Sequence, residues 1–256
     1  DIARTMADGN YDAAFLAVGA HIAKRAFIPA KDSSRILDAV AVLRSMEGQE
    51  QPMLGRRVVV YGGGNTAIDV ARTAKRLGAT EAIIVYRRTR ERMPAHDFEV
   101  EEALDEGVMV KWLSTIKRSG DDGVLTIEKM VLDAKGNPQP TGEFETLEAD
   151  SLVLALGQDV DLSLLDGVPG LQLNGGVVQV DPVTMMTGHP GLFAGGDMVP
   201  AERNVTVAVG HGKKAARHID AWLRGTQLAP KPKHAPARFE NLNPWYYSDA
   251  PKTVRP

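Results

Sequence analysis

A glycine-rich turn between a strand-like run and an amphipathic segment decides much of what this chain can fold into. Residues 58–60 are three consecutive valines, which is typical of a parallel strand buried on both faces. Three glycines follow at 62–64, and glycine adopts backbone conformations that are closed to other residues. Apolar residues then recur at helical spacing over residues 65–77, and the run AIIVY at 82–86 predicts a second strand. Residues 58–86 are therefore predicted to form one βαβ unit.

The turn matches a dinucleotide fingerprint of the form G-x-G-x-x-A at Gly62, Gly64 and Ala67. In such a turn one glycine makes the tight bend and the next lets the backbone approach the pyrophosphate. The small third residue lets helix and strand pack closely. The helix N-terminus directs its free N–H groups and its positive end at the phosphates. We therefore predict a nucleotide site that includes Gly62, Gly63, Gly64, Asn65 and Thr66.

The end of the second strand indicates which dinucleotide binds. NAD-preferring sites usually carry Asp or Glu about 20 residues past the turn, whereas arginine accommodates a 2′-phosphate. This chain has Arg87 and Arg88 at that point, with Arg90 and Arg92 behind them. Because arginine suits bidentate contact with phosphate, NADP is favoured. NAD remains the alternative, since arginine also stacks on adenine, and Arg90 and Arg92 fit a solvated basic edge.

Other segments before residue 150 complete an α/β pattern. The run 11–20 suits a buried strand that ends at a glycine. Helical spacing over 33–48 predicts a helix, with Ser33 or Ser34 as its cap. A further helix is expected over 96–107. Alternating runs and turn clusters over 108–148 predict an antiparallel meander.

The last third of the chain contains two more apolar runs that end in glycine. Residues 151–157, SLVLALG, and 191–197, GLFAGGD, predict buried strands, and 175–181 predicts a short alternating strand. A helix with an apolar face is expected over 205–223. Residues 227–256 are rich in proline and aromatic residues without periodicity, which is typical of an extended tail.

Composition narrows the classes of function. The balance of 30 basic and 33 acidic residues gives no field that favours nucleic acid. With no cysteine, the chain has no disulfide, thiolate metal site, Cys-ligated iron–sulfur cluster or Cys nucleophile. No apolar run reaches the roughly 18 residues of a membrane span, and the first residues do not resemble a signal peptide. We therefore expect a cytoplasmic protein with no metal site of its own.

Several motifs together resemble a known family. The run VVVYGGGNTAIDVARTAKRLGA, followed by VYRRTRERMPA, resembles the pyridine-nucleotide domain of the small (β) subunit of glutamate synthase and its FAD oxidoreductase relatives. The resemblance continues through SLVLALGQ and GLFAGGDMVPAERNVTVAVGHGKKAA, in the order of the family. It implies an α/β fold in which a Rossmann-like NAD(P)-binding domain is inserted into a partial FAD-binding domain of the disulfide-reductase type, with an antiparallel β meander.

The resemblance also implies domain bounds and flavin contacts. Residues 1–22 and 153–226 are expected to belong to the FAD-binding domain, 23–152 to the NAD(P)-binding domain, and 227–256 to the tail. Asp197 is expected to contact the FAD ribityl or pyrophosphate portion, and the helix from about Val205 directs its N-terminus at the flavin ring. The flavin-side residues implied by the resemblance are Gly196, Asp197, Thr206 and Val207, and Gly157, at the end of the run 151–157, is expected to bind a cofactor.

The function implied is hydride transfer from NAD(P)H, with NADPH favoured, to FAD, and then to iron–sulfur centres or a partner subunit. No catalytic side chain is assigned, because the two cofactors carry the chemistry, and His211 is interpreted as structural. The family's earlier FAD fingerprint and cysteine-rich iron–sulfur domain are absent from residues 1–256, so we expect a partial flavin site.

That departure leaves a second interpretation open. The chain is then a nucleotide-binding or docking module of a larger redox complex, without turnover of its own. The aromatic tail residues Phe239, Trp245, Tyr246 and Tyr247 would anchor it on a partner. A short-chain dehydrogenase is disfavoured, because no tyrosine precedes a lysine by four residues.

Overall fold

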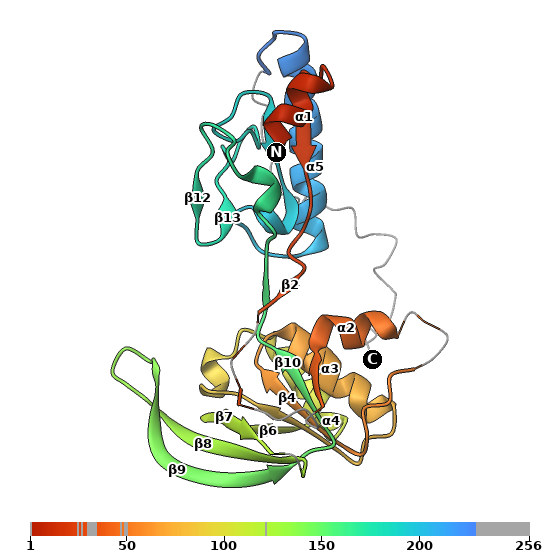
Figure 1. Cartoon of the computed structure of the whole chain (residues 1–256), viewed down its shortest axis with the longest axis vertical. Helices are drawn as coiled ribbons and strands as arrows, with labels where there is room; N and C mark the ends of the chain where they lie inside the picture. The colour runs from red at the N-terminus through yellow and green to blue at the C-terminus, as the bar shows by residue number, and fades with distance from the viewer. Residues whose placement is uncertain are drawn as a thin grey trace, which may run out of the picture.

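The structure, a computed structural model, has two lobes joined by a narrow two-stranded ribbon (Figure 1). It describes residues 2–24, 26, 28–29, 35–46, 48, 51–120 and 122–228. The aromatic tail and the proposed caps Ser33 and Ser34 lie outside the described residues. Among those described, no helix has both the length and the apolar character needed to cross a membrane.

The larger lobe is built on a five-stranded parallel sheet in the order β3-β10-β4-β5-β6. Successive residues of β4 face opposite sides of it, as the strand period of two requires. Val58 and Val60 pack against the helices, whereas Val59 and Tyr61 pack against an antiparallel sheet on the other face. The strands are Ile36–Asp38 (β3), Ser151–Ala155 (β10), Arg57–Gly62 (β4), Glu81–Val85 (β5) and Met109–Lys111 (β6).

Three helices cover one face of this sheet. The five buried residues of α3, which spans Asn65–Arg76, are all small or branched and lie on one side of the helix. This confirms the βαβ unit predicted from residues 58–86. The other helices are Ala39–Ser45 (α2) and Asp97–Asp105 (α4), and a 3₁₀ turn, Arg90–Arg92 (η1), precedes α4.

The helix predicted over 33–48 begins later than its spacing indicated. Ile36 and Leu37 belong to edge strand β3, which pairs in parallel with β10. Asp38 is the helix cap, since its Oδ1 accepts a hydrogen bond of 2.9 Å from the Ala41 N–H. Pairing with the sheet edge has therefore overridden a helical apolar pattern.

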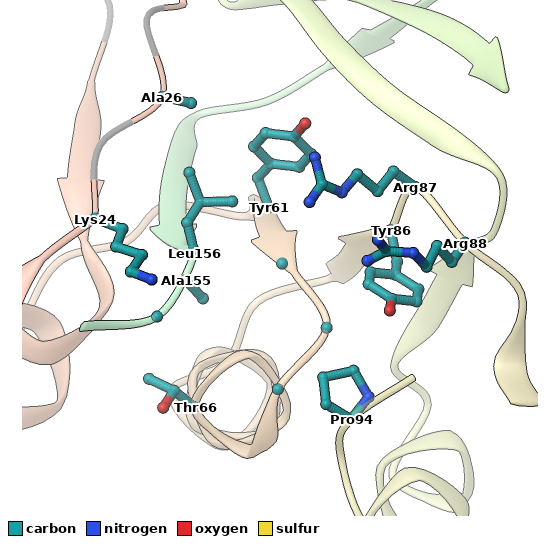
Figure 2. Close-up of a pocket in the computed structure, with 14 residues that line it drawn as sticks. Lys24, Ala26, Tyr61, Thr66, Tyr86, Arg87, Arg88, Pro94, Ala155 and Leu156 are labelled. Carbon is teal, nitrogen blue, oxygen red and sulfur yellow. The ribbon is translucent and has the colours of Figure 1, made fainter. Parts of the chain in front are cut away.

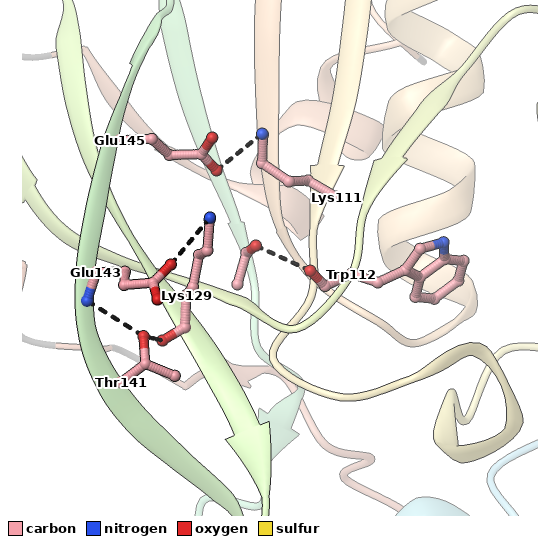
Figure 3. Close-up of polar contacts among 7 residues, drawn as sticks. Lys111, Trp112, Lys129, Thr141, Glu143 and Glu145 are labelled. Carbon is pink, nitrogen blue, oxygen red and sulfur yellow. Dashed lines mark hydrogen bonds and ion pairs between the residues drawn. The ribbon is translucent and has the colours of Figure 1, made fainter.

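The antiparallel sheet covers the opposite face and confirms the predicted meander. Its strands are Ser114–Ser119 (β7), Val124–Leu132 (β8) and Pro138–Glu148 (β9). Leu125 and Ile127 of β8 are buried against the parallel sheet. An ion pair of 2.8 Å from Lys111 Nζ to Glu145 Oε1 connects β9 to the edge strand β6, and Lys129 pairs with Glu143 nearby at 3.0 Å (Figure 3).

One predicted segment differs from the structure, and one predicted domain bound falls within a strand. Met109–Lys111 was predicted as part of the meander, but it is the fifth strand of the parallel sheet. The predicted domain bound after residue 152 falls inside β10, whose five residues all pair with β4. The sheet therefore continues to Ala155 before the chain leaves this lobe.

The smaller lobe packs around the parallel pair β1 and β14. Its core centres on Leu192 and Phe193, with Met185 and Met198 beside them. The long helix α5, Val205–Leu223, runs along this lobe (Figure 1) and confirms the helix predicted there. The other elements are Ile2–Asp8 (α1), Ala14–Leu16 (β1), Ser163–Leu165 (η2), Leu173–Asn174 (β12), Val177–Val178 (β13), Leu192–Ala194 (β14) and Gly196–Met198 (η3).

The ribbon between the lobes consists of two short antiparallel strands, Ile22–Ala23 (β2) and Gln158–Asp159 (β11). One strand leaves the smaller lobe after β1, and the other leaves the larger lobe after β10 (Figure 1). The chain therefore crosses between the lobes twice at this place.

Candidate functional site

A cavity of about 460 Å³ opens at the carboxyl ends of β4 and β10 (Figure 2). The connection from β4 leads to β5 on one side, whereas β10 and β3 lie on the other, so the strand order reverses here. Ligands of open α/β sheets bind at such switch points. The cavity is lined by Lys24, Ala26, Tyr61, Gly62, Gly63, Gly64, Thr66, Tyr86, Arg87, Arg88, Pro94, Ala155, Leu156 and Gly157.

Each of the three positions in the turn is a glycine for a separate physical reason. A Cβ on Gly62 would overlap the carbonyl oxygen of Ala155 in the neighbouring strand, and a Cβ on Gly63 would overlap the ring of Tyr86. A Cβ on Gly64 would meet no described heavy atom within 4 Å. The first two glycines are therefore needed for packing, whereas the third keeps the start of α3 open to the cavity.

The predicted role of Ala67 is confirmed by its packing. Its side chain is completely buried where α3 passes over the parallel sheet. Gly64 is the N-cap residue of α3, in an extended conformation and without a side-chain cap. The first N–H groups of the helix thus start at the edge of the cavity, which suits an anion.

The two arginines sit on a loop that β6 and the segment directly after it hold in place. The backbone N–H of Tyr86 donates to the Lys111 carbonyl at 3.0 Å, and the Leu113 N–H donates to the Arg88 carbonyl at 3.2 Å. Tyr86 Oη donates to the Arg92 carbonyl at 2.7 Å. Within the described part of the chain, no ion pair or hydrogen bond involves the guanidinium of Arg87 or Arg88. Both are available to a ligand.

Asn65 does not line the cavity. Its Oδ1 accepts a hydrogen bond of 3.1 Å from the His96 N–H, and the Ala95 N–H donates to the Gly63 carbonyl at 3.2 Å. These bonds fasten the loop of Pro94, which forms one wall, to the glycine turn. The Asn65 side chain thus has a bracing role that the fingerprint did not reveal.

The charge of the cavity has one sign. Its lining includes three cationic side chains, Lys24, Arg87 and Arg88, and none of its described lining residues is acidic. Two cations lie at the end of β5, and the third comes from the ribbon on the far side. The arrangement suits an elongated ligand with separated anionic groups.

A second cavity of about 400 Å³ lies in the smaller lobe. It contains Gly196 and Asp197, together with Arg203 and the first turn of α5. Thr206 and Val207 do not line it, and the Val207 N–H already donates to Asn204 Oδ1 at 2.9 Å. A cofactor contact by those two residues stays a prediction.

His211 braces the turn of the second cavity. Its Nδ1 accepts a hydrogen bond of 3.1 Å from the Gly196 N–H, so the ring is neutral and carries its proton on Nε2. Burial, and secondarily the charge of Lys214, lower the pKa of His211 below its ordinary value, which favours this neutral form. The predicted structural role of His211 agrees with this geometry.

The twelve predicted cofactor residues therefore divide into three groups. Seven share the first cavity, namely Gly62, Gly63, Gly64, Thr66, Arg87, Arg88 and Gly157, and Gly196 and Asp197 share the second. Asn65, Thr206 and Val207 line neither. Sequence reasoning missed Lys24, Tyr61, Tyr86 and Pro94 in the first cavity and Phe15 and Arg203 in the second. Tyr61, adjacent to Gly62, and Tyr86, adjacent to Arg87, carried a local signal.

Comparisons with known proteins agree with this architecture. Residues 4–212 match the family model of the pyridine nucleotide-disulphide oxidoreductases. The chain is 38% identical over 244 residues to the NADP(+)-dependent formate dehydrogenase subunit beta of Moorella thermoacetica, covering 90% of this chain and 34% of that protein. It is 38% identical over 187 residues to the glutamate synthase (NADPH) small chain of Azospirillum brasilense, covering 69% and 39%.

Among solved structures, T. acidophilum thioredoxin reductase superposes with a TM-score of 0.66 at 18% identity, covering 82% of this chain and 65% of that one. This likeness confirms the predicted fold class, and the relatives confirm the resemblance to glutamate synthase small subunits. The chain spans 34% to 39% of the length of the two curated relatives.

Proposed function

The chain belongs to the pyridine nucleotide-disulphide oxidoreductase family, and we propose that it is the NADPH-binding, hydride-transferring unit of a flavin-dependent oxidoreductase. In this proposal NADPH binds the first cavity and FAD binds the second, across the ribbon. The electrons then pass to iron–sulfur centres or a partner subunit outside this chain. The names of the two curated relatives, both NADP(H)-linked subunits, support this assignment.

The first cavity carries the proposal. Its cationic lining fits the phosphates of NADPH, and the open space at Gly64 fits the close approach of a diphosphate to the helix start. We assign the 2′-phosphate to Arg87 and Arg88, because their guanidinium groups suit bidentate phosphate contact. The apolar residues Ala155 and Leu156 are left for the nicotinamide end.

The second cavity fits part of a flavin. Its backbone turn at Gly196, its carboxylate at Asp197 and the positive end of α5 are all features that a flavin site uses. When both cofactors are bound, they supply the hydride transfer and single-electron release, and the protein supplies position and electrostatics. No side-chain acid or base is assigned.

A direct test is anaerobic mixing of the chain, loaded with FAD, with NADPH. We expect the oxidised flavin absorbance to bleach, and to bleach more slowly with equal NADH. The same chain without added FAD serves as the blank. If FAD is held and its absorbance persists after NADPH is added, the oxidoreductase proposal is wrong.

One observation keeps the docking module as a second candidate. Apolar residues around the second cavity are exposed, with Val205 at 80% and Val209 at 65%. Such a surface suits a cofactor or chain that covers it. Binding of NADPH without FAD binding or electron transfer to artificial acceptors would favour the module. Bound FAD with turnover would favour the oxidoreductase.

A further inference from the structure

The sequence fingerprint does not reveal the role of Lys24, which reaches the first cavity from the ribbon. The Lys24 N–H donates to the Gly157 carbonyl at 2.9 Å, directly after the β2–β11 pair. Its side chain passes over Gly157, where Cδ lies 3.8 Å from the position of a Cβ. That distance is ordinary van der Waals contact, so the backbone of Gly157, with φ +95°, and not the course of Lys24 disfavours a side chain there.

The ammonium group has a weak partner. Lys24 Nζ pairs with Asp159 Oδ1 at 3.1 Å, and the two side chains are 49% and 58% exposed. Exposed pairs of this kind contribute little to stability, with measured values of about 0.2 to 1 kcal/mol. A ligand with greater negative charge can therefore displace Asp159 at small cost.

The position of Lys24 complements the arginines. Figure 2 shows Lys24 and Thr66 on one side of the glycine turn, and Arg87 and Arg88 on the other. If the two arginines take the 2′-phosphate, the remaining anionic group of NADPH is its diphosphate. Lys24 is the remaining cation among the described lining residues of this cavity.

We propose that Lys24 binds the diphosphate of the dinucleotide and exchanges its Asp159 contact for it. This inference rests on the proposed function, because it deepens the assignment of the same cavity. It also makes the ribbon responsive to the ligand, since the Lys24–Asp159 pair connects the residue directly after β2 to β11.

The test is calorimetric titration of the full chain with NADPH and with adenosine 2′-monophosphate, which has the 2′-phosphate but no phosphate at the 5′ position. Lys24→Met is expected to weaken NADPH about tenfold, the scale of one charged hydrogen bond, and to leave the 2′-monophosphate unchanged. Asp159→Asn is expected to tighten NADPH roughly two- to fivefold, because it removes the competing anion. A merely structural ion pair would make both variants weaken binding.

Two further variants serve as controls. Lys129→Met removes a similar exposed pair, with Glu143, far from the cavity, and should leave both ligands unchanged. Arg87→Ala should weaken both ligands. If Lys24→Met binds NADPH like the wild type, or loses affinity for the 2′-monophosphate equally, the role of Lys24 is refuted while NADPH binding stands. If the wild type binds neither ligand, the proposed function and this inference both fail.

Discussion

The two lobes hold their glycine turns by different means. In the larger lobe, the Ala155 carbonyl and the Tyr86 ring crowd Gly62 and Gly63, and both belong to a buried sheet and its flanking loop. In the smaller lobe, Gly195 and Gly196 lie against the side chains of Phe15 and His211. One turn is fixed by the sheet backbone and a buried aromatic ring, and the other by an aromatic ring and the titratable side chain of His211.

The helices that follow the two turns also differ, in how many of their residues are buried. The helix α3 buries five of its 12 residues, whereas α5 buries only two of its 19. Packing of an apolar face is the main source of helix stability in proteins. We infer that the larger lobe, called the nucleotide lobe below, owes more of its stability to its own packing than the smaller lobe does.

The largest expected effect comes from Gly62→Ala. The added Cβ would overlap the Ala155 carbonyl inside the parallel sheet, and backbone atoms there cannot move aside cheaply. We expect the free energy of unfolding to fall by about 3 kcal/mol, the scale of overpacking at a special backbone site. Urea unfolding of the wild type and the variant measures this loss.

The matched control is Gly64→Ala, two residues away. The new methyl group meets no described atom within 4 Å, so stability should change by less than about 1 kcal/mol, the scale of an N-cap effect. NADPH affinity should nevertheless fall, because the methyl group enters the space assigned to the diphosphate. If both substitutions destabilised the chain equally, the distinction between Gly62, needed for packing, and Gly64, needed for ligand binding, would be wrong.

Coenzyme choice is the next effect in size. Arg87→Ala is expected to weaken NADPH by about 1 to 3 kcal/mol while leaving NADH nearly unchanged, because only NADPH has a 2′-phosphate. Arg90→Ala is the control, since Arg90 pairs with Glu101 at 3.0 Å and does not line the cavity. Equal losses for NADPH and NADH in titrations of Arg87→Ala would contradict the 2′-phosphate role.

A smaller effect concerns the acid stability of the nucleotide lobe. Hydrogen bonds from Arg72 and Arg76 lower the pKa of Glu106 to about 2. Because this pKa is below that of the unfolded chain, the stabilisation is complete above about pH 4.5 and disappears as the pH falls through about 2. Arg76 is 64% exposed, so solvent screening reduces the contribution to about 1 kcal/mol.

Glu106→Gln should therefore lower the free energy of unfolding by about 1 kcal/mol at pH 7 and flatten its decline between pH 4.5 and 2. Glu102→Gln is the control, because Glu102 shares Arg72 but is 56% exposed. It should produce a smaller change. An unchanged acid profile in Glu106→Gln, measured by urea unfolding across pH, would contradict the assigned role.

Local sequence patterns predicted the βαβ unit and the arginines of the nucleotide lobe. They did not predict Lys24, which lines the opposite wall of the first cavity. The βαβ unit and the arginines lie within one stretch, where strand, turn and helix signals reinforce one another. Lys24 lies far earlier in the chain and reaches the cavity only because β2 pairs with β11. Long-range pairing of two-residue strands leaves no periodic signal in a sequence.

The same limit explains the two misassigned segments. Ile36 and Met109 start short strands at the two edges of the parallel sheet, and each pairs with one neighbour only. Three-residue strands carry too few positions to distinguish a period of two from a period of 3.6. Tertiary pairing, which a single sequence does not display, decided both.

The smallest expected effect tests the bracing histidine of the smaller lobe. Because burial lowers the pKa of His211, the unfolded lobe takes up a proton first as the pH falls below about 6.5, and the folded lobe loses stability. Protonation of Nδ1 also removes the acceptor for the Gly196 N–H. We expect hydrogen-exchange protection of residues 192–198 to fall by under about 1 kcal/mol between pH 7 and 5, the scale of one hydrogen bond, while that of residues 58–64 stays constant.

His211→Asn should abolish this pH dependence, because Asn Oδ1 accepts the same hydrogen bond and does not titrate. His211→Ala should give low protection at both pH values. His96→Asn is the control, because the His96 ring stacks on Phe98 in the other lobe and does not contact this turn. If residues 58–64 lose protection together with 192–198 in the wild type, pH acts on the whole chain. The contrast between a turn held by packing in the parallel sheet and a turn braced by the titratable side chain of His211 would then be wrong.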